Sequence, residues 1–110
     1  MQVAYMQWFR LQYPRVICYA TPNAGKRSPQ LGAWLKEEGM LSGVADLTIL
    51  HPSSKKHLLF IELKIPPNKP SQAQLDFIAY ANSLDYLAVV CFSLEEAMNA
   101  TKEHLKDYTC

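Results

Sequence analysis

GVADLTILHPSSKKHLLFIELK is the sequence of residues 43–64, and its pattern predicts the centre of the fold. Two extended apolar runs, Asp46 to Leu50 and His57 to Lys64, flank the polar turn Pro52-Ser53-Ser54-Lys55-Lys56. This arrangement predicts a β-hairpin with a longer loop. The run Leu58 to Ile61 is apolar at every position, which is typical of a central strand that is covered on both faces. The segment therefore predicts the middle of a helix-covered sheet.

Upstream of this hairpin we predict a helix, a strand and a second helix. Residues 2–12 contain no Gly or Pro and have helical periodicity, whereas residues 16–20 are rich in β-forming side chains. Ser28 as a cap and Pro29 at the first helical position predict a helix start, and Gly39 predicts its end. The apolar faces expected for the two helices are Val3, Met6, Phe9 and Tyr13 for the first, and Leu31, Trp34 and Leu35 for the second.

Downstream of the hairpin we predict a helix, a buried strand and a last helix. Ser71 and Gln74 have the spacing of a capping box, Tyr86 to Phe92 is an apolar run, and Ser93 with Glu96 has the spacing of a second box. The order is therefore α-β-α-β-β-α-β-α. The expected fold class is α/β, a mixed β-sheet flanked by helices, in a single domain over residues 1–110.

Composition excludes several classes of protein. The 110 residues are 49% hydrophobic, which is enough for one domain with a core. No apolar stretch is long enough to span a bilayer, and the first residues lack a signal-peptide pattern. The three cysteines are odd in number and widely spaced, so a disulfide framework or zinc site is not favoured. We expect no membrane partner and an intracellular, cytoplasmic location.

Net charge alone does not indicate a nucleic-acid partner, because it is only +1. Its distribution is uneven, since no acid precedes Glu37 while five basic residues do. A basic segment of this kind suits phosphates, although a solvated surface is an equal alternative. The five residues are Arg10, Arg15, Lys26, Arg27 and Lys36.

Glu62 and Lys64 lie two residues apart at the end of the second predicted hairpin strand. Residues two apart share a face of a strand, so these side chains project side by side while Ile61 and Leu63 face the other way. Charges at the end of an apolar strand are unfavourable unless they are paired, hydrated or bound to a ligand. One explanation is a strand that emerges into solvent just before Pro66.

Asp46 favours a second explanation. It begins the first hairpin strand, so antiparallel pairing would bring its carboxylate close to that of Glu62. Two converging carboxylates are hard oxygen ligands, which Mg²⁺ takes while it keeps several waters. The ammonium of Lys64 would hold an attacking water and offset charge on a phosphate. The three side chains together predict a site that hydrolyses phosphodiesters.

The chain also resembles a known nuclease family. Asp46, fifteen further residues and then Glu62-Leu63-Lys64 are similar to the PD-(D/E)xK nuclease superfamily. Three other motifs are Asn23-Ala24-Gly25-Lys26-Arg27, Gly43-Val44-Ala45-Asp46-Leu47 and Ser71-Gln72-Ala73-Gln74. In this order they resemble the turn, strand and helix motifs of the virus-type replication-repair nuclease (VRR-NUC) family. The resemblance covers essentially the whole chain and implies a restriction-endonuclease-like fold.

The resemblance implies a role for each matching residue. Asp46 and Glu62 would bind the metal through their carboxylates and Leu63 through its backbone carbonyl, with Mg²⁺ as the metal and Mn²⁺ as a substitute. Lys64 would be the catalytic lysine. Gln74 would support catalysis, unless it serves only in the helix-capping contact. The residues expected to contact DNA are Asn23, Gly25, Lys26, Arg27 and Ser71.

The implied function is metal-dependent endonucleolytic hydrolysis of branched or flap DNA, as in viral Holliday-junction resolvases. Such an enzyme would serve phage or mobile-element replication or repair, in the host cytoplasm if the protein is viral. Two symmetric cuts need two symmetric sites, so a homodimer is expected. Residues 23–27, which the resemblance implies contact DNA, have an alternative explanation as a turn with solvated charges.

Two positions depart from the family pattern. Ala45 replaces the usual proline but leaves the Asp46 carboxylate in place. The first helix of the family usually presents a glutamate to the metal, whereas residues 1–36 contain no acid and only Gln2 lies near the expected place. A rival function is therefore a catalytically silent DNA-binding module with the same fold. A protein-interaction domain without a nucleic-acid partner is a third possibility.

Other residues are better explained by structure than by function. The histidines show no ligand spacing, and the two tryptophans have apolar neighbours at helical spacing that favour core positions over stacking on bases. Lys55-Lys56 is expected to be a solvated turn. The histidines and tryptophans are His51, His57, His104, Trp8 and Trp34.

Overall fold

The computed structural model describes residues 1–22 and 29–109, and its elements follow the predicted order. The mixed α/β class is confirmed, although the strands are shorter than predicted. No helix among the described residues is long and apolar enough to cross a membrane. The elements are α1 (Gln2–Gln12), β1 (Cys18–Ala20), α2 (Pro29–Glu37), β2 (Leu47–Ile49), β3 (Leu59–Leu63), α3 (Gln72–Ser83), β4 (Leu87–Cys91) and α4 (Leu94–His104).

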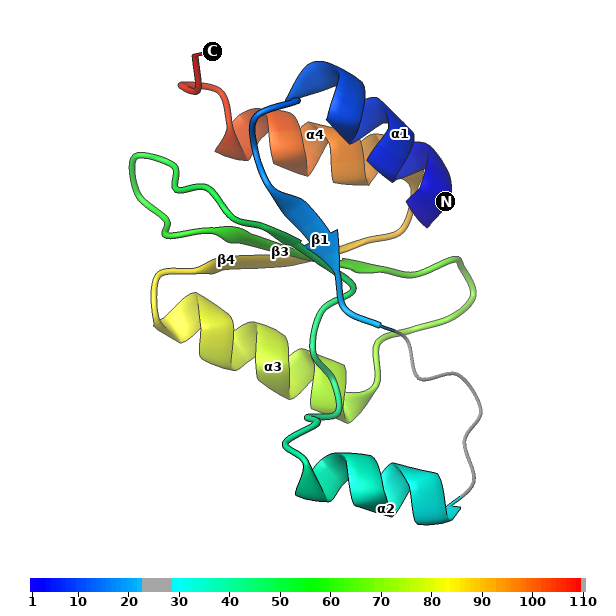
Figure 1. The fold of residues 1–110 in the computed structure, drawn as a ribbon. Helices are drawn as coiled ribbons and strands as arrows, with labels where there is room; N and C mark the ends of the chain where they lie inside the picture. The colour runs from blue at the N-terminus through cyan, green and yellow to red at the C-terminus, as the bar shows by residue number, and fades with distance from the viewer. Residues whose placement is uncertain (23–28, 110) are drawn as a thin grey trace.

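The four strands form one sheet in the order β1-β2-β3-β4 (Figure 1). β2 pairs antiparallel with both β1 and β3, whereas β3 and β4 are parallel and are connected through α3. β3 is therefore an inner strand. Leu59 and Ile61 of this strand are fully buried, which explains the apolar run seen in the sequence.

Helices cover both faces of the sheet (Figure 1). α1 and α4 lie together on one face, where the buried hydroxyls of Tyr5 and Thr101 form a hydrogen bond of 2.6 Å between the two helices. α3 covers the other face, where the ring centroids of Phe60 and Phe77 are 5.1 Å apart. The main apolar core lies under α1 and α4. The face under α3 has a more polar environment at the end of β3.

The buried face of α1 differs in part from the prediction. Tyr5 and Phe9 are its buried residues, whereas Val3 is exposed. The aromatic side chains of the helix contact one another, and Trp8 packs partly buried against the core as expected. Helical spacing had favoured Val3, but aromatic rings bury more apolar area than valine does and therefore determine how the helix is oriented.

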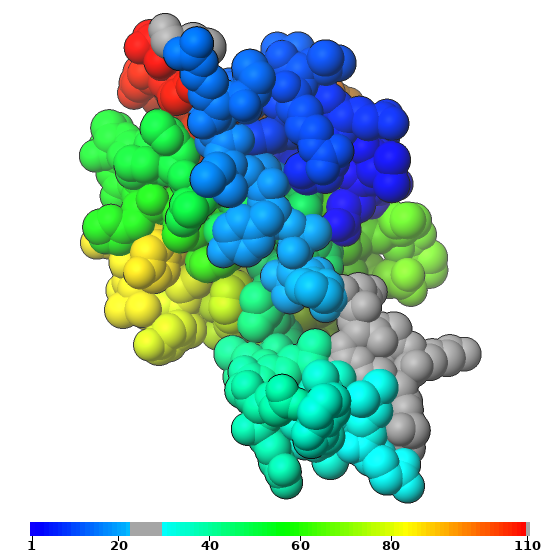
Figure 2. Space-filling model, viewed as in Figure 1, coloured from blue at the N-terminus to red at the C-terminus, as the bar shows by residue number. Residues whose placement is uncertain are grey.

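α2 does not bury the apolar face that the sequence predicted. Leu31 is exposed and Trp34 is 57% exposed, so the expectation that Trp34 lies in the core is wrong. Figures 1 and 2 show the reason, because α2 projects from the body beyond α3 and does not pack on the sheet. Periodicity identifies an apolar face but does not show what will cover it.

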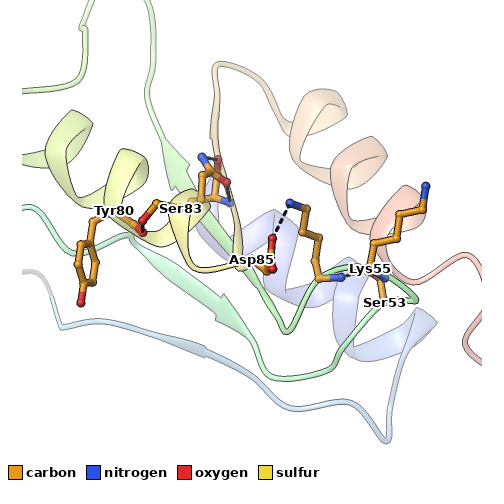
Figure 3. A network of polar contacts seen from close by, with 8 residues as sticks. Ser53, Lys55, Tyr80, Ser83 and Asp85 are labelled. Atoms are coloured by element: carbon orange, nitrogen blue, oxygen red, sulfur yellow. Dashed lines mark hydrogen bonds and ion pairs between the residues drawn. The ribbon is translucent and has the colours of Figure 1, made fainter.

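The loop between β2 and β3 makes polar contacts at the end of the molecule where β3 begins (Figure 3). Lys56 Nζ lies 3.8 Å from the Asp85 carboxylate, and the Ser53 hydroxyl accepts hydrogen bonds from the backbone N–H groups of Lys55 and Lys56. Glu62 lies at the opposite end of β3. The two lysines are therefore surface residues distant from the candidate site.

Candidate active site

The pairing of β2 with β3 brings Asp46 and Glu62 together. Leu47 is opposite Ile61 in this antiparallel pair, so the next residue on each side places Asp46 opposite Glu62. Residues directly opposite each other in an antiparallel pair have side chains on the same face. The juxtaposition expected from the hairpin is thus present, on the face covered by α3.

Glu62 is a buried carboxylate, with 2% of the residue exposed. Its Oε1 atom accepts a hydrogen bond of 2.9 Å from Gln74 Nε2 and lies 3.9 Å from Lys64 Nζ. Its Oε2 atom is buried and has no hydrogen-bond partner among residues 1–22 and 29–109. An unpaired buried carboxylate oxygen is destabilising, so this atom needs a proton or another group to satisfy it.

The environment of Glu62 favours its neutral form. Burial, together with the negative charge of the adjacent Asp46, raises the pKa of Glu62 to about 7, although the ammonium of Lys64 acts in the opposite direction. Two carboxylates at such close range cannot both ionise easily without a compensating charge. The pair can be satisfied by a shared proton or by a bound cation.

Asp46 is held in place through both its side chain and its backbone. Its Oδ2 atom accepts a hydrogen bond of 2.7 Å from the backbone N–H of Leu63, and its carbonyl accepts one of 2.8 Å from Thr21. The loop before it passes close to α3 at Gly43, which has a φ of 90°. A Cβ atom at this position would clash with the carbonyl oxygen of Ala73, so only glycine fits.

Lys64 directly follows β3 and points into the same region. Its backbone N–H donates a hydrogen bond of 3.0 Å to the carbonyl of Cys91, which extends the parallel pairing with β4 past Glu62. Its side chain is 21% exposed, so the ammonium is partly desolvated but can be reached from solvent. A cation in this position stabilises negative charge better than one fully surrounded by water.

Gln74 acts both in capping α3 and in holding Glu62. The Ser71 hydroxyl accepts a hydrogen bond of 3.2 Å from the Gln74 backbone N–H, and Gln74 Oε1 accepts one of 2.8 Å from the Ser71 backbone N–H. The amide group Nε2 is left to donate to Glu62. The two explanations that the sequence left open for Gln74 are therefore compatible.

These side chains line one cleft of about 520 Å³. The cleft contains no third acid, and no group of three or more His, Cys, Asp and Glu side chains suited to a metal occurs among the described residues. Gln2, at the first position of α1, also lines it, which is where the sequence placed the residue nearest to the site. The predicted residues that meet in the cleft are Asp46, Glu62, Leu63, Lys64 and Gln74.

Comparison with known proteins identifies the family and the fold of the chain. Residues 1–94 match the family model of the VRR-NUC domain. The chain belongs to the VRR-NUC family. A solved structure of a VRR_NUC domain protein superposes on it with a TM-score of 0.78 at 22% identity, covering 96% of this chain and 84% of the other, and thus has the same fold. No curated protein sequence matches the chain.

A VRR-NUC domain has a nuclease-type, DNA-processing function, and part of the predicted DNA-contacting set can be placed in this one. Ser71 is exposed at the start of α3, with its hydroxyl engaged in the cap. The other four predicted residues lie outside the described part of the chain. They are Asn23, Gly25, Lys26 and Arg27.

Sequence reasoning missed several residues that line the cleft of this VRR-NUC domain. Lys36, in the last turn of α2, is one of them, and so is Leu41 in the loop that leads to Gly43. Lys36 could have been singled out in the sequence because it is the last basic residue before the first acid of the chain. Because α2 lies away from the sheet, helix periodicity gave no indication that its end reaches the site.

Proposed function

We propose that this VRR-NUC domain is a metal-dependent DNA endonuclease whose active site consists of Asp46, Glu62, Lys64 and Gln74. The observation that carries the proposal is the buried Oε2 atom of Glu62, which has no partner among the described residues and belongs to a carboxylate that adjoins Asp46. In a purely structural ion pair, both oxygens of such a buried carboxylate would have partners within the protein. In a site that a cation completes, one oxygen is left for the cation.

The donor set fits a hard divalent cation. The Asp46 and Glu62 carboxylates and the Leu63 carbonyl, all from residues that line the cleft, are oxygen donors of the kind that Mg²⁺ accepts. A divalent charge would also offset the repulsion that raises the pKa of Glu62. Gln2 adds a neutral amide at the edge of the set, so affinity for Mg²⁺ should be weak and Mn²⁺ should bind more tightly.

The chain's own side chains supply the remaining parts of the reaction. When bound, the cation would polarise the scissile phosphate and lower the pKa of water. Lys64, which lines the cleft, would hold the attacking water and offset charge that develops on the phosphate. Gln74 holds the Glu62 carboxylate in one orientation through its amide, which bonds Oε1 and leaves Oε2 without a partner among the described residues. Asp46 is fixed in the same way by the Leu63 N–H.

The proposed substrate is branched or flap DNA, and the proposed assembly is a homodimer. The basic first third of the chain, with Lys26 and Arg27 in the motif before α2, supports binding to phosphates. Lys36 and Lys64 both line the cleft and supply positive charge beside the two acids. Two copies related by a twofold axis would allow paired cuts in a symmetric junction.

A catalytically silent DNA-binding module is the second candidate, and one observation favours it. The helix that would provide a further acid in a VRR-NUC site presents Gln2 instead. The retention of two adjacent acids and a lysine in the same cleft favours catalysis, because a module that only binds DNA gains nothing from buried negative charge.

The experiment that tests the proposal is incubation of the protein with labelled linear, flap and four-way DNA, each with Mg²⁺, Mn²⁺ or EDTA. We expect cleavage of the flap or four-way substrate with either metal and none in EDTA. Binding of all three without cleavage under any metal would support the silent module and overturn the proposal. Sedimentation of the same samples tests the dimer.

A further inference from the structure

A second hollow lies next to the active-site cleft and has no part in the chemistry described so far. Its volume is about 510 Å³, ample for one nucleobase. The walls are mainly apolar, with Phe92 at the end of β4 and Leu75 on α3 among them. Phe92 is 37% exposed, so part of its ring surface is open to solvent. Three prolines complete the walls: Pro66, Pro67 and Pro70.

One short loop separates this hollow from the cleft. Lys64 and Ile65 line the cleft, and the residues that directly follow, 66–70, line the hollow. The loop is closed by a hydrogen bond of 3.0 Å from the backbone N–H of Asn68 to the carbonyl of Ile65. Its prolines have fixed φ angles, which restrict the conformations available to it. Figures 1 and 2 show this segment, between β3 and α3, extending from the body.

Two polar residues contribute to the lining of the hollow. Asn68 and Lys69 belong to its lining, and Lys69 is exposed. Neither side chain has an ion-pair or hydrogen-bond partner within the described ranges. An apolar slot with an aromatic ring, a side-chain amide and a free cation matches the parts of a nucleotide, whose base stacks, whose edge forms hydrogen bonds and whose phosphate is anionic.

We propose that this hollow binds an unpaired nucleobase of the DNA strand that is cut. Phe92 would stack on the base, the prolines and Leu75 would enclose it, and Lys69 would contact the adjoining phosphate. The proposal rests on the proposed nuclease function, because the cleft places the scissile phosphate on the other side of the same loop. A paired base is stacked within the duplex, so it must leave the duplex before it can stack on Phe92. The hollow therefore selects DNA with an unpaired nucleotide next to the cut.

Charge and position favour this occupant over a peptide. A hydrophobic peptide segment would fill the apolar walls but would bring no anionic group to Lys69. A nucleic-acid strand that continues from the cleft carries a phosphate at each step, so it satisfies the cation as well as the walls. Stacking of a base on an aromatic side chain typically changes affinity by roughly 5- to 100-fold, which is large enough to set a substrate preference.

The test measures DNA affinity in EDTA, where no cleavage is expected. A blunt duplex is compared with the same duplex that carries a single-stranded flap. The variants are Phe92→Ala and Lys69→Ala, and the matched controls are Tyr80→Ala, an exposed aromatic residue on α3 outside the hollow, and Lys55→Ala, an exposed lysine at the far end of β3. We expect the parent and both controls to prefer the flap, and Phe92→Ala to lose about fivefold or more of that preference.

A photocrosslink on the unaltered protein covers the case in which Phe92→Ala fails to fold. A 5-iododeoxyuridine at the first unpaired position should crosslink to Phe92, as mapped by mass spectrometry. A crosslink to another aromatic residue, or an unchanged flap preference in both Phe92→Ala and Lys69→Ala, would overturn the proposal. Cleavage in Mg²⁺ or Mn²⁺ is measured in parallel. Cleavage without this preference would contradict the base site alone, and the preference without cleavage would contradict the nuclease function alone.

Discussion

Gln74 Nε2 donates a hydrogen bond of 2.9 Å to the carboxylate of Glu62, and this contact connects the cap of α3 to the most deeply buried acid of the cleft. The rest of the Gln74 side chain belongs to the capping box with Ser71. The helix start and the active site therefore share one side chain.

Substitution of each partner of the box separates the two roles of Gln74. Ser71→Ala removes the hydroxyl that accepts from the backbone N–H of residue 74 but keeps the contact with Glu62. Gln74→Ala keeps that cap but removes the reciprocal half of the box, from the Ser71 N–H to Gln74 Oε1, together with the contact with Glu62. Each variant should lose about 1 kcal/mol of unfolding free energy. Only Gln74→Ala should also lower metal affinity or cleavage rate, by roughly 10- to 100-fold. Denaturant unfolding and metal titration measure the two effects, and equal metal affinities would reduce Gln74 to a capping residue.

Glu62 should make the metal-free protein less stable as the pH rises. Its pKa is raised from 4.5 to about 7 in the folded protein, so the stability that it contributes is present below pH 4.5 and is lost as the pH rises through 7. Glu62→Gln removes this dependence. Thermal unfolding of both proteins in EDTA between pH 4 and pH 8 should give curves that diverge with increasing pH, the variant being the more stable at pH 8. Parallel curves would show that Glu62 is not perturbed.

A series of three glycines tests how closely the Asp46 loop must approach α3. Gly32→Ala has open space and should be neutral or stabilising by about 0.5–1 kcal/mol. Gly39→Ala has a φ of 102° but also open space, and should destabilise by about 1–2 kcal/mol. Gly43→Ala adds a clash with Ala73, so it should destabilise by about 3 kcal/mol or more and should weaken metal binding. A loss no greater than that of Gly39→Ala would contradict the close approach.

Gln2→Glu should strengthen metal binding. Gln2 lines the cleft, and an acid in the first turn of α1 is also favourable toward the helix dipole. Gln7→Glu, at an exposed position of the same helix that does not line the cleft, is the matched control. A metal titration of the cleavage rate should give half-saturation at a lower metal concentration for Gln2→Glu alone. The same half-saturation point for all three proteins would mean that α1 does not reach the metal.

Much of this fold and the core of its candidate site could be predicted from sequence because both depend on local rules. The period-2 and period-3.6 patterns gave the eight elements, and the hairpin gave the approach of Asp46 to Glu62. The position of α2 could not be predicted in this way, because an apolar face such as that of Trp34 does not specify a partner. For the same reason, the sequence did not predict that Lys36 and Leu41 line the cleft.

The loop after Lys64 is a second example. One explanation offered from the sequence was a strand that emerges into solvent just before Pro66, but the hollow that the prolines of the loop form with Phe92 depends on where β4 ends and α4 begins. Such a contact between distant segments has no periodic signal. It depends on the parallel pairing of β3 with β4, which brings the ends of the two strands side by side.

The most direct test of the proposed active site is the cleavage rate of a labelled flap DNA in saturating Mn²⁺, measured for the parent, Asp46→Asn and Glu62→Gln. Both substitutions keep the shape of the side chain and one acceptor oxygen, so the Asn can still accept from Leu63 and the Gln from Gln74. DNA affinity in EDTA and thermal unfolding serve as controls: affinity should be retained, and cooperative unfolding should show that both variants are folded. We predict that cleavage is abolished in both variants while the parent cuts. Parental cleavage rates in either variant would contradict the assignment of these two carboxylates as the metal site.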